Sequence, residues 1–374
     1  MRTLVILIAL TAAAYGQRHK AVEDVDTEKP EGKLLQPALQ ENDPAKKAVL
    51  LEQFAQQFPK FDGTPWVLEQ LQAIYVKAGD ADKTIATGEK LLALDPDDPE
   101  AALQNLKASE NKKDVEGVKK WSAVTSANAR KMASSPQPKE AEQVDSWKSE
   151  VAYAKQVDQY TDYAIYRAAS ESRDPKVTVE LLELLQTHNP KSEYIPKAQN
   201  QLFLAYRQAG MNDKAVALAE KTLATDQTNE DMLLVAADSH SRSKTEPEKV
   251  HAYSAKLVEL MASKPKPEGV SDADWAARRN LITGLAHYMS GALYYRETKY
   301  PQADKELRAA LPLVGSNQEI KAEVLYELGF ANYKMDKPQE AADYYRECSA
   351  IKSQFQPLAT KNLQGIKTQF RGIK

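Results

Sequence analysis

Residues 322–351 have the sequence AEVLYELGFANYKMDKPQEAADYYRECSAI, and this stretch decides the fold. Its marker residues have the spacing of two helices that pack against each other, and they are Leu328, Gly329, Tyr333, Ala341, Tyr345 and Cys348. One such helix pair cannot bury its apolar face alone, so one good copy implies several stacked neighbours. The stretch therefore predicts an all-α chain of repeated helix pairs.

A second well-defined pair precedes it in the chain. Its marker residues are Gly291, Tyr294, Tyr300, Ala303, Leu307 and Ala310. In both pairs a glycine precedes an alanine by twelve residues, Gly291 before Ala303 and Gly329 before Ala341. This spacing predicts small residues where the two helices of a pair approach each other most closely.

These residues resemble the tetratricopeptide-repeat family. The resemblance is strong over residues 322–351, good over 284–311, 65–96 and 196–229, and weak elsewhere. It implies a right-handed superhelical solenoid of antiparallel helix pairs whose inner groove binds peptides or proteins. Residues 357–370 are expected to form a C-terminal capping helix that shields the last apolar face.

The composition agrees with an all-α fold. The 374 residues include only 14 glycines, and helix-forming residues are frequent. The 50 basic and 53 acidic residues give a net charge of −3, which offers no broad attraction for nucleic acid. Short basic clusters such as Lys112-Lys113 are diluted by Asp114 and Glu116, as on solvated helix faces.

Three segments are expected along the chain. Residues 1–16 have the form of a secretory signal, with Arg2 before a short apolar run and small residues at its end. Residues 17–43 mix charges with prolines and are expected to be a flexible tether. Residues 44–374 are expected to form the solenoid, and the proline-containing loop near 264–270 is a possible position for a bend.

The signal-like segment predicts export. Cleavage after Gly16 fits the small residues at its end, which places the protein in the periplasm or outside the cell. The alternative is an uncleaved segment that anchors the protein in the inner membrane. No cysteine follows the apolar run, so a lipid-modified N-terminus is not expected. The signal and the lack of paired cysteines are typical of a bacterial protein.

The single cysteine, Cys348, allows no internal disulfide. It occupies a position where the repeat needs a small residue. We therefore expect a buried cysteine that fills an alanine-sized space, and not a reactive thiol.

The resemblance also implies which residues line the groove, namely outward-facing residues of each pair's first helix. In the last two pairs these candidate partner-binding residues are Leu285, Tyr288, Tyr295, Arg296, Glu323, Tyr326, Phe330, Tyr333 and Lys334. Aromatic side chains with a few cations are typical of binding hot spots. The alternative is that some of these tyrosines pack between repeats or against the capping helix.

One subfamily binds C-terminal carboxylates with Lys and Asn on successive first helices, and this chain lacks that set. Asn332 falls on the packing side of its helix, and Tyr326 and Phe330 occupy two positions where such a clamp needs Lys and Asn. A carboxylate clamp is therefore not expected.

No residue pattern indicates catalysis, a metal or a cofactor. The five histidines are scattered without the spacing of a zinc enzyme, and no phosphate-binding loop or nucleophile motif occurs. Glu323 and Glu327 are the nearest candidates for a glycosidase acid pair, but solvation on one helix surface is the simpler account. Acidic pairs such as Asp97-Asp98 are expected to open helices.

The sequence thus predicts an exported, non-catalytic scaffold that binds proteins or peptides of unknown identity. Two alternatives remain open. One is an accessory of envelope assembly or polysaccharide export, held at a membrane complex by an uncleaved N-terminal anchor. The other is an enzyme of helical-toroid architecture.

Overall fold

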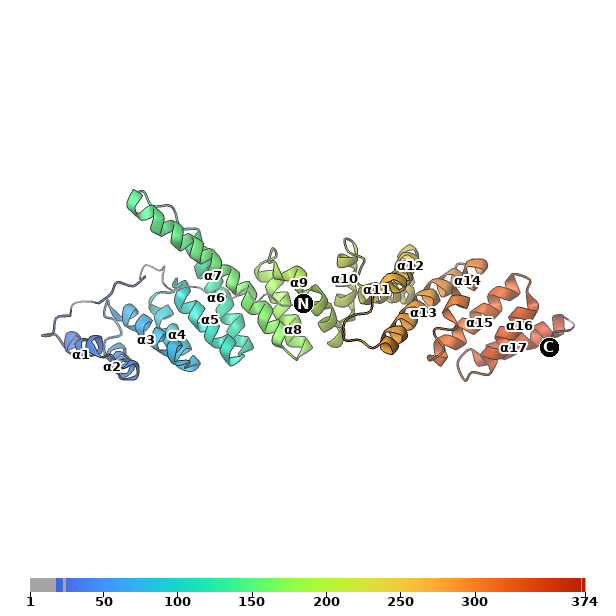
Figure 1. Cartoon of the computed structure of the whole chain (residues 1–374), viewed down its shortest axis with the longest axis horizontal. Helices are drawn as coiled ribbons and strands as arrows, with labels where there is room; N and C mark the ends of the chain where they lie inside the picture. The colour runs from blue at the N-terminus through green and yellow to red at the C-terminus, as the bar shows by residue number, and fades with distance from the viewer. Residues whose placement is uncertain (1–17, 23–24, 371, 374) are drawn as a thin grey trace. The chain divides into compact units, whose positions relative to one another are not determined.

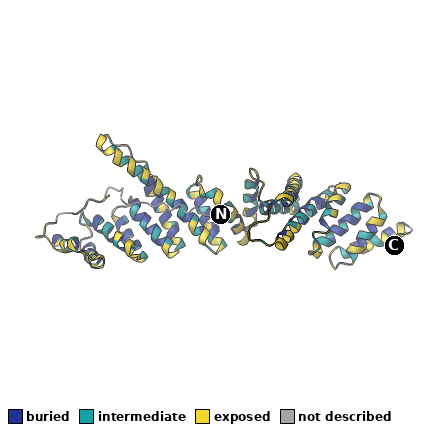
Figure 2. Cartoon of the chain, in the orientation of Figure 1, coloured by how far each residue is buried: buried dark blue, intermediate teal, exposed yellow. Residues whose placement is uncertain are grey.

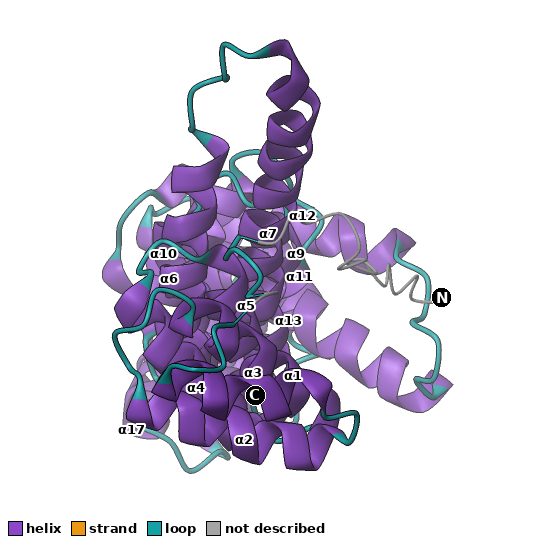
Figure 3. Cartoon of the chain, turned by 90° about the vertical axis from the view of Figure 1, so that its left-hand side faces the viewer, coloured by secondary structure: helices purple, strands orange, loops and turns teal. Residues whose placement is uncertain are grey.

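Every regular element is helical in the part of the chain that the computed structural model describes, residues 18–22, 25–370 and 372–373. This part contains seventeen α-helices and one short 3₁₀ helix, joined by loops and turns (Figure 3). The signal-like segment 1–16 lies outside these residues.

The helices fall into two compact units, Met1–Ala205 and Tyr206–Lys374. The first contains eight complete α-helices: α1 (Pro30–Gln40), α2 (Pro44–Gln57), α3 (Thr64–Ala78), α4 (Ala81–Leu94), α5 (Pro99–Lys112), α6 (Val115–Ala133), α7 (Val144–Glu171) and α8 (Pro175–His188). Figure 1 shows them arranged side by side in chain order.

The second unit contains α10 (Asn212–Leu223), α11 (Glu230–Ser243), α12 (Pro247–Ser263), α13 (Asp272–Arg296), α14 (Tyr300–Ala310), α15 (Gln318–Lys334), α16 (Pro338–Ser349) and α17 (Gln356–Gln369). The division between the units falls within α9 (Tyr194–Gln208). The expected pairs at 65–96, 284–311 and 322–351 correspond to α3–α4, the later part of α13 with α14, and α15–α16.

Local sequence signals explain where the helices begin. Asp98 accepts hydrogen bonds from the backbone N–H groups of Glu100 and Ala101 at 2.8 and 3.1 Å and so opens α5, as expected of this acidic pair. The Ser271 hydroxyl accepts from the N–H of Asp274 at 3.1 Å and caps the start of α13. Gly79 ends α3 at φ +70°, a conformation that glycine adopts without strain.

Packing within each unit follows the chain. From α1 to α8 and from α10 to α17 each helix packs on the next. The first helices of successive pairs also contact one another: α3 with α5 and α5 with α7 in the first unit, α11 with α13 and α13 with α15 in the second. The fold is therefore an all-α, tetratricopeptide-like stack of helix pairs. The loop at 264–270 joins α12 to α13, and these two helices pack against each other.

The glycines at close helix approaches lie where the twelve-residue spacing predicts them, but they face larger side chains. A Cβ on Gly291 would come within 2.8 Å of Leu307, and one on Gly329 would come within 2.8 Å of the Tyr345 ring. Ala303, like its counterpart in the last pair, is fully buried. The glycine thus makes room for a residue one turn beyond the alanine.

The segment expected to be a tether contains a helix. Residues 30–40 form α1, which begins with a proline at its first turn, and Leu35 is fully buried in a core with Leu51 and Phe54 of α2 and Val67 of α3. Proline suits the first turn of a helix because no intrahelical partner is lost there. The mixed charges of this segment lie on its exposed face, which is why composition alone indicated disorder.

The N-terminal half of α7 extends beyond its neighbours (Figure 1). Burial begins only at Ala154, and every earlier residue of α7 is exposed or partly exposed (Figure 2). The indole N–H of Trp147 donates to the carbonyl and to the hydroxyl of Ser135 at 3.1 Å.

The C-terminal end of the stack is closed as expected. Helix α17 packs on α16, with Ala359 and Ile366 buried in a core shared with Tyr345 and Cys348. Cys348 is fully buried, its sulfur lies 3.3 Å from the carbonyl oxygen of Ala322, and burial raises the pKa of its thiol to about 11. The interpretation of Cys348 as a packing residue is confirmed.

Candidate protein-binding surfaces

The residues expected to line the groove lie on α13 and α15. We call this set the aromatic surface: Leu285, Tyr288, Tyr295 and Arg296 on α13, with Glu323, Tyr326, Phe330, Tyr333 and Lys334 on α15. Every member is partly or largely exposed. The Tyr288 hydroxyl donates to Glu323 at 2.8 Å, and the rings of Tyr295 and Phe330 meet edge to face at 5.5 Å between centroids. These contacts join the two helices across the surface.

Two members turn toward the C-terminal end of the stack. The Tyr326 ring packs against Tyr345 and Phe355 with centroids at 5.7 and 5.5 Å, and the Tyr333 hydroxyl donates to Gln369 at 3.1 Å. Tyr333 thus contacts the capping helix α17, and Tyr326 contacts Phe355 directly before it, as the alternative interpretation expects. Tyr333 and Phe330 also line an open cavity of about 290 Å³ beside Lys361, Asn362, Gly365, Ile366 and Gln369 of α17.

The two cations of the aromatic surface are held differently. Arg296 donates to both the carbonyl and the hydroxyl of Ser241 on α11, each at 3.1 Å. Lys334 lies over the Phe330 ring, with its ammonium 5.4 Å from the centroid. Arg296 therefore fixes the edge of the surface to α11, whereas Lys334 covers the ring that a partner would contact.

Glu327 is a residue of this region that the sequence analysis interpreted wrongly. It lies one turn from Glu323 and Phe330 on α15, yet it is only 6% exposed, and its Oε2 has no hydrogen-bond partner among the described residues. Burial, reinforced by Glu323 and opposed by Arg296, raises its pKa to about 8. The simple account of a solvated carboxylate does not hold.

The first unit contains a second candidate surface, which the sequence analysis did not find. A cavity of about 340 Å³ opens among the first helices of three pairs, and we call it the acidic pocket. Its polar lining includes Glu69 and Gln72 of α3, Asp98 at the start of α5, Glu100 and Gln104 of α5, and Tyr153 of α7. Its walls come from residues far apart in the sequence, so no local pattern marks it.

The chain's own N-terminal segment lies beside this pocket, and Arg18 forms part of its wall. Arg18 donates through Nε to Asp95 Oδ2 at 2.5 Å and through a terminal nitrogen to Asp95 Oδ1 at 2.9 Å. One ring nitrogen of His19 lies 3.2 Å from Glu69 Oε2 and the other 3.2 Å from Asp95 Oδ2. The hydrogen bond to Glu69 raises the pKa of His19 against the effect of burial, assisted by the charges of Asp98 and Glu69 and by the hydrogen bond to Asp95.

A buried amide network supports the floor of the pocket. Gln72 is 3% exposed and its side-chain N–H₂ donates to Asn105 Oδ1 at 3.0 Å and to the carbonyl of Ala101 at 3.2 Å. Gly88 of α4 lies directly behind this pair, and a Cβ there would overlap both side chains. The network fixes α3 and α5 relative to each other because buried amides are costly to leave unpaired.

His19, Asp95 and Asp98 have ligand atoms within 4.8 Å of one another, the arrangement of a possible metal site. Their hydrogen bonds favour a different account. Both oxygens of Asp95 accept from Arg18, and Asp98 Oδ1 caps α5. The guanidinium already supplies the positive charge that a metal would bring. We interpret the cluster as an ion-pair site.

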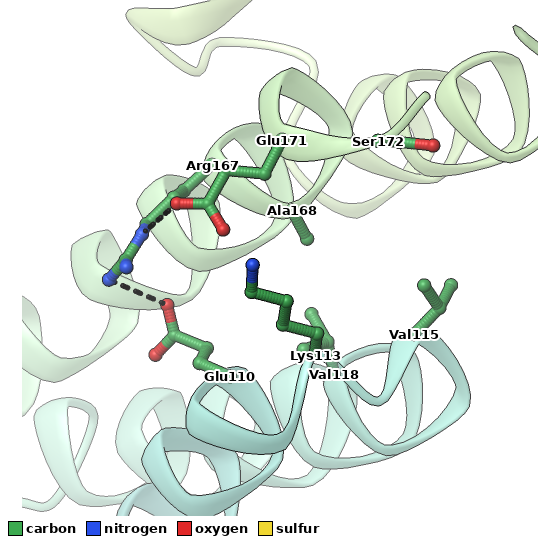
Figure 4. Close-up of a pocket in the computed structure, with 8 residues that line it drawn as sticks. All are labelled: Glu110, Lys113, Val115, Val118, Arg167, Ala168, Glu171 and Ser172. Atoms are coloured by element: carbon green, nitrogen blue, oxygen red, sulfur yellow. Dashed lines mark hydrogen bonds and ion pairs between the residues drawn. The ribbon is translucent and has the colours of Figure 1, made fainter. Parts of the chain in front are cut away.

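A smaller cavity of about 110 Å³ lies between the α5–α6 turn and the end of α7 (Figure 4). Glu110 accepts from the Tyr160 hydroxyl at 2.7 Å and pairs with Arg167 at 3.9 Å, and Arg167 also donates to Glu171 at 2.9 Å. Lys113 points between the two helices. Opposite charges therefore meet within a volume too small for a peptide.

No helix in the described part of the chain is long and apolar enough to cross a bilayer.

No protein-family model matches the chain, and no curated protein matches it. Solved structures do match. The tetratricopeptide domain of P58(IPK) is 14% identical, with 92% of this chain and 100% of that chain covered and a TM-score of 0.28. Yeast Tom70 is 15% identical, with 92% of this chain and 74% of that chain covered and a TM-score of 0.25.

Proposed function

We propose that the protein is an exported, non-catalytic scaffold that binds proteins or peptides on surfaces lined by the first helices of its repeats. The main observation in support of this proposal is the aromatic surface on α13 and α15. Tyr288, which donates to Glu323, and Tyr295, which packs on Phe330, are only partly buried although they lie beside the core. Phe330 is likewise only partly buried. Partly exposed aromatic side chains beside cations are a typical composition of interface hot spots.

The fold supports a binding role over catalysis. Glu323, the nearest candidate acid, accepts a hydrogen bond from Tyr288, and its neighbour Glu327 is buried. A glycosidase requires two carboxyl groups that face a shared substrate space, whereas these two lie one turn apart on a single helix. The enzyme hypothesis is therefore the weaker one.

Export rests on the form of residues 1–16, with cleavage after Gly16. The alternative is an accessory of envelope assembly or polysaccharide export that keeps this segment as an inner-membrane anchor. The two versions differ in the mature N-terminus, so sequencing it decides between them. A start at Gln17 supports the exported scaffold, and an intact Met1 supports the anchored accessory.

Binding is tested by affinity purification of the tagged full-length protein from its own cells. A variant with Tyr288→Ala, Tyr295→Ala and Phe330→Ala is compared with a control variant carrying Leu281→Ala, an exposed residue of the same α13. We expect the triple variant to lose partners that wild type and control retain, with circular dichroism unchanged. Retention of every partner by a folded triple variant would exclude this surface.

A further inference from the structure

Residues 18–22 lie beside the acidic pocket, and Arg18, which forms part of its wall, contacts the carboxylate of Asp95 as the arginine of a peptide ligand would. The Arg18 side chain spans both oxygens of Asp95, and the paired side chains are 34% and 24% exposed. This two-point geometry is specific to the planar guanidinium, because a lysine ammonium cannot donate two parallel hydrogen bonds to one carboxylate. The pocket therefore recognises arginine by shape as well as by charge.

The next residue adds a second anchor. His19 is 11% exposed and lies between Glu69 of α3 and Asp95 of the α4–α5 loop. Because these two carboxylates belong to different elements, they fix the position of His19, and with it the position of the segment, relative to the pocket. A protonated imidazole donates to both, which is the form that these neighbours favour.

The segment is also held by apolar contacts. Ala21 and Val22 pack against the core formed by α1, α2 and α3. A Cβ on Gly63, at the start of α3, would come within 2.5 Å of a Val22 methyl group, so this glycine provides the space for the side chain. The segment thus has cationic contacts at one end and apolar contacts at the other.

The charge of the pocket exceeds what the segment neutralises. Four carboxylates, Glu69, Asp95, Asp98 and Glu100, lie in the pocket or at its edge, against three cations, Arg18, protonated His19 and Lys77. Asp98 is 3% exposed, and burial raises its pKa despite the nearby Arg18. Space of about 340 Å³ remains open beside Arg18. A longer basic segment would fill this space and meet more of the negative charge.

We propose that the acidic pocket is the docking site for an extended, arginine-bearing segment of a partner protein, and that residues 18–22 occupy it in cis until such a segment displaces them. This inference rests on the proposed function, because it assumes that the chain binds proteins, and it names the class of partner. The partner's arginine takes the position of Arg18 against Asp95, and apolar residues three or four positions later replace Val22.

A partner segment must compete with residues 18–22 of the same chain, so its affinity for the pocket has to exceed a threshold. A short tether holds its own segment at an effective concentration of the order of millimolar. A partner segment with the same contacts therefore competes poorly, and one with additional contacts to Glu100 or Gln104 competes well. Removing the internal segment raises the apparent affinity for any external one.

The experiment measures binding of the acetylated peptide RHKAV, residues 18–22, to full-length protein by fluorescence anisotropy. Wild type is compared with Arg18→Ala/His19→Ala, in which the pocket is vacated. We expect the double variant to bind at least about tenfold more tightly than wild type. Adding Asp95→Asn should weaken binding about tenfold or more, whereas adding Asp97→Asn, a neighbour that pairs with Lys131, should have little effect.

A second peptide, KHKAV, tests whether recognition depends on the two hydrogen bonds that an arginine donates to the Asp95 carboxylate. We expect it to bind the vacated pocket about tenfold more weakly than RHKAV. Circular dichroism of each variant shows whether it is folded. Three results overturn the inference in folded protein: equal binding by wild type and the vacated variant, equal binding with and without Asp95→Asn, or equal binding of both peptides.

This test is independent of the affinity purification. If peptide binding fails while partners are still lost from the triple variant of the aromatic surface, the scaffold function stands and the acidic pocket is excluded. If peptide binding behaves as expected while no partner is captured in cells, the pocket is supported and the proposed scaffold function is not.

Discussion

The side chains of Gln72 and Asn105, on the first helices of two successive pairs, meet at 3.0 Å directly in front of Gly88. Gln72 is 3% exposed and Asn105 is fully buried, so this hydrogen bond is shielded from water. The bond connects α3 to α5 beneath the acidic pocket and depends on the absence of a side chain at position 88. The hydrogen bond between α3 and α5 therefore requires a glycine on the intervening helix, α4.

The change Gly88→Ala should destabilise the first unit. The new methyl group would overlap both amides, so either the hydrogen bond breaks or the helices separate, at a cost of about 1–3 kcal/mol in the free energy of unfolding. Chemical denaturation measures this cost. The control is Gly365→Ala in α17, where a Cβ meets nothing within 4 Å and stability should rise by at most about 1 kcal/mol. Equal effects would contradict the packing argument.

The pKa of Glu327, raised to about 8, makes stability depend on pH. In unfolded chain this carboxyl ionises near its usual 4.5, so between these values the folded protein holds a proton that the unfolded chain has lost. Stability should therefore fall as pH rises from about 5 to 8, by at most about 1.4 kcal/mol for each pH unit.

The change Glu327→Gln should remove this contribution and stabilise the protein most at pH 8. Urea denaturation of wild type and variant at pH 5.5 and 8 measures the difference. Glu319→Gln, at an exposed position in the first turn of the same helix, is the control. A Glu327→Gln variant that follows wild type at both pH values would show that Glu327 is ionised when folded.

Docking of the N-terminal segment should weaken as pH rises. The pKa of His19 is raised above its usual 6.5 by the hydrogen bond to Glu69, by the charges of Asp98 and Glu69, and by Asp95. Protonated His19 therefore favours the docked segment, and this contribution is lost as pH rises through the raised pKa.

NMR titration of the His19 ring, assigned by its absence in His19→Ala, measures this pKa. We expect a value above 6.5 that falls in Glu69→Gln. Asp62→Asn, an exposed acid outside the pocket contacts, serves as the control and should leave the titration unchanged. A His19 that titrates below 6.5 in wild type would contradict docking between the carboxylates.

Cys348 should be inert toward thiol reagents in folded protein. It is fully buried, and burial raises its thiol pKa to about 11, so the thiolate that reacts is scarce. We expect labelling by a disulfide reagent to be slow in buffer and immediate in urea. Cys348→Ala should cost little stability because the space suits a small side chain. Fast labelling of native protein would indicate that α16 opens readily.

The C-terminal helix pairs could be predicted from short-range signals. Residues 322–351 contain the apolar spacing, the glycine and the turn of one hairpin in a single stretch, and α15 and α16 follow it. Residues 30–40 were different, because α1 is helical mainly through burial of Leu35 against α2 and α3. Mixed charge and two prolines concealed that contact, which is made with residues further along the chain.

The aromatic surface was partly predictable for the same reason. Positions within a repeat indicated that Tyr288, Tyr295 and Phe330 share a face. In the structure two contacts link α13 to α15, one from Tyr288 to Glu323 and one between Tyr295 and Phe330. The burial of Glu327 was not predictable, since it depends on how closely α13 approaches. A one-turn spacing describes one helix and contains no information on its neighbour.

The sequence by itself determined that this chain is all-α and built of stacked helix pairs, because helix periodicity, caps and turn glycines are local properties. Only the tertiary structure decided where binding chemistry is concentrated. Arg18 and Asp95 are 77 positions apart and Tyr153 lies further still, so the acidic pocket exists only once α3, α5 and α7 stack. Stacking creates such sites because each helix contributes one or two side chains to a surface that no single repeat contains.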